Sequence, residues 1–210
     1  MSPLLALALL LQDESPFAPE AKYHAKITFE DGSLLWVKGA KYRFDLTLRR
    51  QKGVIVHDGE STFATEAGTK NATKSPSVTA ALEKLWKSAD TSEKEAVRKN
   101  IADYVFDPVM RDWYKIDGKK FKRSDGGKIL DKETELVEAT AGPALKFWRV
   151  KGTQVVIKLS VMGTLFNPKS IDESADVPDT TFKAPEGYTV KEDEGSAKED
   201  AALLWKQLKK

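Results

Sequence analysis

The fold is decided by residues 22–66, which read KYHAKITFEDGSLLWVKGAKYRFDLTLRRQKGVIVHDGESTFATE. From Lys22 to Glu30, apolar side chains occupy the odd positions and polar ones the even positions, a period-two alternation that predicts a half-buried strand. Asp31-Gly32 is a favourable hairpin turn. The strands expected next are Ser33–Lys38, Lys41–Arg50, Val54–His57 and Ser61–Glu66. Consecutive hairpins of this kind predict an antiparallel meander.

The pattern then changes to helical spacing. Pro76-Ser77 opens one helix, and Ser92 with Glu95 has the form of a capping box for a second. Asp107-Pro108 has the N-cap and N1 chemistry of a short third helix that would run through Trp113. The buried stripe of the second helix would be Val97, Ile101, Tyr104 and Val105. Because the helices interrupt the strands and do not alternate with them, the sequence predicts an α+β protein.

A second run of strands follows the helices. These strands are expected at Lys119–Arg123, Lys128–Ala139, Leu145–Val150, Thr153–Met162 and Ile171–Val177, with Asp125-Gly126-Gly127 as a hairpin turn. Phe182–Val190 is expected to be the closing strand. Residues 191–210 predict an acidic linker that ends in a short amphipathic helix or a frayed tail.

Composition restricts the class of protein. The chain has 210 residues, and 34 Lys and Arg against 32 Asp and Glu give a net charge of +2. This balance argues against nucleic-acid binding, which needs a strong basic excess. The chain has no Cys, so it has neither disulfides nor a cysteine metal site. Its length favours a single domain.

The N-terminus carries an apolar run, Leu4–Leu11, that stops at Gln12. It is shorter than the roughly 20 residues that a spanning helix needs. Residues 1–12 are therefore expected to be a secretory signal peptide, which implies a periplasmic location. The alternative is an N-terminal helix packed on the core.

The sequence shows no constellation for catalysis. His24 and His57 are expected at the surface, and neither has a second His at metal-ligand spacing. There is no Gly-x-Ser-x-Gly nucleophile elbow. We therefore expect a protein that is not an enzyme and has no metal or cofactor.

Lysine and arginine gather between residues 115 and 132. The cluster comprises Lys115, Lys119, Lys120, Lys122, Arg123, Lys128 and Lys132. It is interpreted either as a solvated strand edge protected by lysines or as an electropositive rim that meets anionic lipid headgroups or a partner protein. The rim is assigned to Lys119, Lys120, Lys122 and Arg123.

The apolar face of the sheet is the main candidate site. A sheet this long must close on itself, pair with a partner or enclose something apolar. The residues expected to line its inner face are Trp36, Phe44, Leu46, Leu48, Phe63, Phe147, Ile157 and Leu159, with Trp86 and Trp113 from the helical insertion. A fully packed core is the alternative.

Three segments in order carry a resemblance to a family. These segments are Leu35-Trp36-Val37-Lys38, Val54-Ile55-Val56-His57-Asp58-Gly59 and the closing segment Phe182–Val190 with its P-x-G turn. Through them, the chain resembles the bacterial outer-membrane lipoprotein carriers, the LolA/LolB superfamily. The resemblance covers about Tyr23 to Val190. It implies an incomplete antiparallel β-barrel, a curved sheet with the helical insertion acting as lid, and an apolar cavity that accepts acyl chains.

The chain departs from the carriers at one position. Where they resemble W-V-K-R-P, with an Arg that takes part in lid closure, this sequence has Gly39-Ala40. We expect a divergent, periplasmic, non-enzymatic carrier or sensor that binds the acyl chain of a lipid or lipoprotein. The alternative is an envelope interaction protein with a filled half-barrel core that binds a protein partner through the basic rim.

Overall fold

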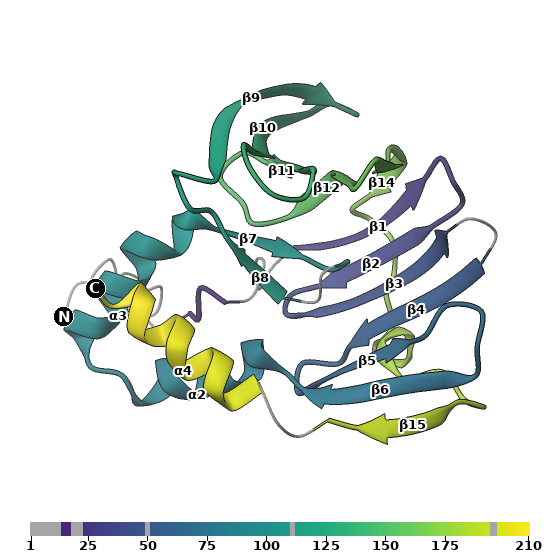
Figure 1. Ribbon diagram of the computed structural model, residues 1–210, viewed down its shortest axis with the longest axis horizontal. Coiled ribbons are helices and arrows are strands. Elements are labelled where there is room, and N and C mark those ends of the chain that lie inside the picture. Colours follow the sequence, from purple (N-terminus) through teal and green to yellow (C-terminus); the bar gives the residue numbers. More distant parts are fainter. Residues whose placement is uncertain (1–13, 18–22, 49–50, 110–111, 194–196) are drawn as a thin grey trace.

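The computed structural model describes residues 14–17, 23–48, 51–109, 112–193 and 197–210 (Figure 1). Its largest sheet has eight strands in the order β14-β1-β2-β3-β4-β5-β6-β15. These are β1 (His24–Phe29), β2 (Leu34–Lys38), β3 (Lys41–Leu48), β4 (Gln51–His57), β5 (Ser61–Thr65), β6 (Asn71–Pro76), β14 (Pro168–Asp172) and β15 (Thr189–Glu192).

A second sheet has the order β13-β12-β11-β10-β9. Its strands are β9 (Phe121–Ile129), β10 (Lys132–Ala139), β11 (Leu145–Val150), β12 (Val156–Val161) and β13 (Thr164–Phe166). A separate hairpin pairs β7 (Tyr104–Asp107) with β8 (Asp112–Lys115). The helices are α2 (Val78–Ser88), α3 (Thr91–Asn100) and α4 (Ala197–Leu208), with 3₁₀ turns η1 (Ile101–Asp103) and η2 (Asp179–Phe182).

The α+β class and the meander are confirmed. Strands β1 to β6 pair antiparallel in sequence order. Both larger sheets are curved, and over the described residues neither closes into a barrel (Figure 1). The helices gather at one end of the eight-stranded sheet. No helix in the described ranges combines the length and the apolar composition needed to cross a bilayer.

The two faces of the eight-stranded sheet are both covered. Leu35, Val37 and Phe44 point into the main core, where they are almost fully buried. Trp36 and Phe63 belong to a second cluster with Val56, Ala72, Val177 and Phe182. Their expected place on the inner face is therefore wrong. Because a strand exposes alternate residues to opposite faces, Trp36 cannot share a face with Leu35 and Val37.

The expected third helix is a β-hairpin. Residues 104–107 pair with residues 112–115, so Tyr104 and Val105 belong to a strand and not to a helical stripe. The cap-like hydrogen bond predicted for Asp107 exists, since its Oδ1 accepts from the backbone N of Val109 at 2.9 Å. Here that bond closes a turn after a strand, which Asp also favours.

The second helix, α3, starts at Thr91, one residue before Ser92, the cap expected from the sequence. Asp90 is the N-cap and accepts from the backbone N of Glu93, while the hydroxyl of Ser92 donates to Asp90. Helix α3 ends at Asn100, so Val97 is its buried residue and Ile101 lies in η1.

The turn expected at Asp125-Gly126-Gly127 and the strand expected at Phe182–Val190 are both placed differently in the structure. Asp125-Gly126-Gly127 lies inside β9, where Gly126 is the extra residue of a β-bulge, and the real turn is at Leu130 and Asp131, both at positive φ. The closing segment Phe182–Val190 is not one strand. Its first part crosses the outer face of the eight-stranded sheet, and only Thr189–Glu192 forms β15, which pairs in parallel with β6.

The C-terminal helix is part of the core and not a frayed tail. In α4, the side chains of Ala201, Trp205 and Leu208 are buried in the main cluster. The carbonyl of Leu208 also accepts from the side-chain amide of Asn100 at 2.7 Å. The expected signal peptide, residues 1–12, lies outside the described residues, so it stays a prediction.

Candidate functional site

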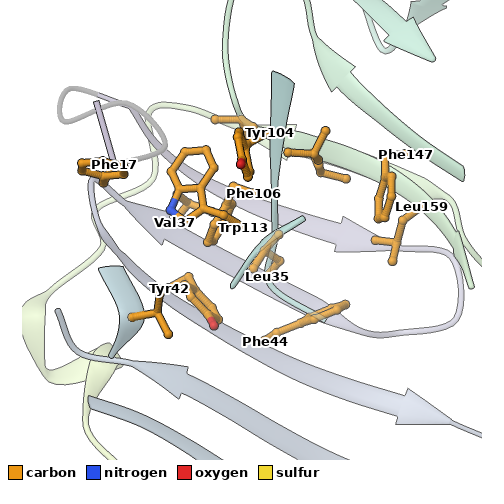
Figure 2. Packing of buried hydrophobic residues seen from close by; sticks show 14 of the residues in the cluster. Phe17, Leu35, Val37, Tyr42, Phe44, Tyr104, Phe106, Trp113, Phe147 and Leu159 are labelled. Carbon is orange, nitrogen blue, oxygen red and sulfur yellow. The ribbon is translucent and has the colours of Figure 1, made fainter. Parts of the chain in front are cut away.

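The inner face of the eight-stranded sheet meets the five-stranded sheet in one apolar cluster (Figure 2). The expected lining residues Phe44, Leu46, Phe147, Ile157 and Leu159 all belong to this cluster, as do Trp86 and Trp113. Leu48 lies at the end of β3, and its side chain is outside the described part. The ligand contacts assigned to these residues stay predictions, but seven of the ten side chains do share one apolar interior.

The β7–β8 hairpin covers this interior and touches both sheets through aromatic rings. Phe106 packs edge-on against Tyr42 of β3, with ring centroids 5.1 Å apart. Tyr114 lies 5.6 Å from Phe147 of β11. By contrast, β7 and β8 are hydrogen-bonded only to each other as strands. The hairpin is therefore held over the concave face by side-chain packing and not by strand pairing.

The base of the hairpin is fixed to the five-stranded sheet by arginines. The buried guanidinium of Arg149 donates to the carbonyl of Tyr104 at 3.1 Å and pairs with Glu135 at 2.6 Å. Arg123 donates to the carbonyl of Ala102 at 2.6 Å. These bonds tie η1 and the first residue of β7 to β9 and β11, while Phe106 and Tyr114 contact the two sheets through their rings.

Sequence reasoning missed Arg149, although a signal was present. It follows Leu145 and Phe147 at period two, so it occupies the buried face of β11. A charged residue in an apolar alternation needs a partner, which the Glu135 carboxylate and the carbonyls of η1 and β7 supply.

A groove of about 270 Å³ opens where the hairpin meets helices α2 and α4. Its walls are mostly apolar, with one basic and one acidic side chain. The lining residues are Val78, Tyr104, Trp113, Lys115, Asp200, Leu203, Leu204 and Gln207. Leu203 is 60% exposed, which is unusual for a residue of its size, and it stands on the rim of this groove.

His57 is buried, so its expected surface position is wrong, whereas His24 is exposed as expected. The His57 ring stacks on Tyr42 and bonds Thr62 Oγ1 through Nδ1 at 3.1 Å and Ser77 Oγ through Nε2 at 3.3 Å. Burial lowers the pKa of His57 to about 4, although the neighbouring Asp58 carboxylate opposes that shift.

The Ser77–His57 contact joins the sheet to a helix. Ser77 is the N-cap of α2, and its Oγ accepts from the backbone N of Ala80 at 3.0 Å. Both side chains are almost completely buried, so Ser77 is not presented to solvent as a nucleophile would be. Among the described residues, no three metal-ligating side chains cluster.

The basic rim is partly neutralised. Lys122 pairs with Glu138 at 3.5 Å and Arg123 with Asp103 at 3.2 Å. Lys119 and Lys120 are exposed, and neither has an ion pair with another described residue. The protein or lipid partner assigned to this rim stays a prediction, now concentrated on Lys119 and Lys120.

Gly39 has a backbone conformation that accounts for a glycine at this position. Its φ is +56°, in the left-handed region that glycine adopts without strain. It closes the turn from β2 to β3, and its N donates to the carbonyl of Tyr23 at 2.9 Å.

Comparison with known proteins gives little. No family model matches the chain, and no curated protein sequence does. Among solved structures, the chain is similar to one titled "Crystal structure of MucB", with 11% identity and a TM-score of 0.32. The match covers 90% of this chain and 66% of that one. So low a TM-score does not establish a shared fold.

Proposed function

We propose that the protein is a periplasmic, non-enzymatic carrier or sensor that holds an acyl chain against the concave apolar face of its eight-stranded sheet. The observation that supports this most is the way in which the β7–β8 hairpin covers the apolar interior. The β7–β8 hairpin lies over the apolar interior, yet it pairs as a strand with neither larger sheet. The hairpin would therefore move away from the apolar interior without breaking hydrogen bonds to either larger sheet.

The arginine contacts define how the hairpin would move. Arg149 and Arg123 hold the carbonyls of Tyr104 and Ala102, which lie at one end of the hairpin. The Phe106 and Tyr114 rings contact the two sheets and are held by packing alone. Opening would therefore pivot at the arginine-fixed base and lift these rings from the apolar face.

The energetics favour an acyl chain that takes the place of the hairpin on the apolar face. Each methylene transferred from water contributes about 0.8 kcal/mol. The chain would replace the contacts that Phe106 and Tyr114 make in the closed form, so only the surplus appears as affinity. Modest, reversible binding is what a carrier or a sensor needs.

The location of a bound chain can be tested with a spin-labelled fatty acid. Doxyl-stearate is added to protein with ¹³C-labelled methyl groups, and broadening of each methyl resonance is measured. The methyls of Leu35, Val37 and Leu159 face the main core and are expected to broaden. Those of Val54 and Val56 pack with the outer cluster and are matched controls, expected to stay sharp.

Two results would contradict the proposal. One is the absence of any binding of doxyl-stearate, together with no lipid in native mass spectra of protein purified without detergent. The other is broadening of the outer methyls in place of the inner ones, because the chain would then bind elsewhere.

A further inference from the structure

Phe17 is completely buried, although the neighbouring described residues Glu14 and Ser15 are exposed or half-buried. Its ring contacts three tryptophans: Trp86 of α2, Trp113 of β8 and Trp205 of α4. Figure 2 shows Phe17 and Trp113 at this end of the core. The centroid distances are 6.4, 6.5 and 6.1 Å, within the range of favourable aromatic contacts. Each tryptophan comes from a different element of the helical end of the molecule. We call this arrangement the tryptophan cage.

The main-chain N of Phe17 is held only weakly. The N of Phe17 donates to Ser15 Oγ at 3.4 Å, a long contact within the same short segment. Residues 14–17 pair with no strand of the described sheets. The side chain is therefore held in the cage by packing, in the way that a bound apolar ligand would be.

The cage adjoins a surface groove. Trp113 is a wall of the tryptophan cage and also lines the 270 Å³ groove between the hairpin and α4. Val78, Leu203 and Leu204 continue this groove as an apolar path to the surface. A linear molecule that lay in the groove would contact Trp113.

The charges around the cage select the kind of ligand. Arg98 and Lys94 of α3 stand over the Trp86 ring, at 4.7 and 5.5 Å from its centroid. Lys115 and Asp200 both line the groove, and Lys115 Nζ donates to Gln207 Oε1 at 3.2 Å. Cations already occupy one aromatic face, so a cationic guest is disfavoured. A straight alkyl chain fits the apolar path, and its anionic end would be attracted by Arg98 and Lys94.

We propose that Phe17 is an intramolecular plug, and that the first part of an acyl chain enters through the groove and takes the place of its ring in the tryptophan cage. This inference rests on the proposed function, because it names the way in and the regulation of the same acyl-binding interior. The plug keeps the cage filled when no ligand is bound. It also lowers the apparent affinity, since only molecules with the plug displaced can bind.

The test measures the affinity of dodecanoate by displacement of dansyl-undecanoic acid. Phe17→Ala is expected to tighten the dissociation constant about tenfold, if the plug occupies the cage about nine-tenths of the time. Phe17→Leu keeps an apolar side chain and is expected to give a smaller gain. Phe182→Ala is the matched control, because Phe182 is an equally buried phenylalanine in the outer cluster.

A second measurement needs no variant. Saturating dodecanoate is expected to accelerate hydrogen–deuterium exchange in a peptide containing residues 14–17 of the wild-type protein. Wild-type affinity in both Phe17 variants, with unchanged exchange at residues 14–17, would overturn the plug and leave acyl binding intact. No binding by any of the proteins would overturn the proposed function as well.

Discussion

The buried imidazole of His57 makes the stability of the protein depend on pH in a specific window. In the unfolded chain the pKa of His57 is 6.5, and in the native protein burial lowers it to about 4. Between these values the unfolded chain binds a proton that the native state excludes. Stability therefore falls as the pH decreases from 6.5 toward 4, and His57 contributes no change above pH 7.

The magnitude follows from that interval of about 2.5 pH units. At about 1.4 kcal/mol per unit, His57 should lower the free energy of unfolding by about 3 kcal/mol between pH 6.5 and pH 4. The assay is urea unfolding followed by tryptophan fluorescence, at pH steps from 4.5 to 7.5. In His57→Gln, an amide that does not titrate replaces the imidazole, and it can still bond Thr62 and Ser77.

The expected result is a difference between the two pH profiles. The wild-type curve should fall below that of His57→Gln by up to about 1.4 kcal/mol for each pH unit under 6.5. His24→Gln is the control, because His24 is exposed, and it should follow the wild-type curve. Parallel curves for wild type and His57→Gln would refute the reasoning, because His57 would then titrate alike in both states.

Two further predictions concern the stability of the sheet and of the C-terminal helix. Gly126→Ala should destabilise the protein by about 1–3 kcal/mol in urea, because the added Cβ would stand 2.5 Å from a threonine hydroxyl on β10. Gly118→Ala, where a Cβ meets nothing within 4 Å, should be nearly neutral, and equal effects of the two substitutions would contradict the bulge geometry. Trp205→Ala should cost about 3–5 kcal/mol, as expected for a large buried aromatic side chain. Leu203→Ala on the exposed side of the same helix should change stability by less than about 0.5 kcal/mol, and a small effect of Trp205→Ala would show that α4 is peripheral.

The alternation in residues 22–66 was sufficient to predict the first five strands of the meander, but β6 was not predicted. It was not sufficient to predict which face of each strand meets the core. In β2, the inward residues are Leu35 and Val37, while Trp36 lies under the segment around Val177 and Phe182. Where both faces of a strand carry apolar residues and both become buried, period two alone does not choose between them.

Some local signals of capping and turns were correct in their chemistry and wrong in their context, whereas Ser77 caps α2 and Asp31-Gly32 forms a turn as expected. Asp107 does accept a local backbone hydrogen bond, but in a hairpin. Gly126 and Gly127 are used for a bulge, and Leu130 and Asp131 make the turn despite their positive φ. These choices depend on which strand lies alongside, because pairing across β9 and β10 outweighs the preference of a single dipeptide.

The sequence by itself determined the α+β class, the antiparallel meander and most of the apolar residues that fill the interior, because these depend on local periodicity. Only the tertiary structure decided that Phe17 enters a tryptophan cage, that Arg149 fixes the base of the hairpin and that His57 is buried against Ser77. Each of these contacts joins residues far apart in the chain. Their energies come from burial and pairing that exist only once the sheets and helices have packed together.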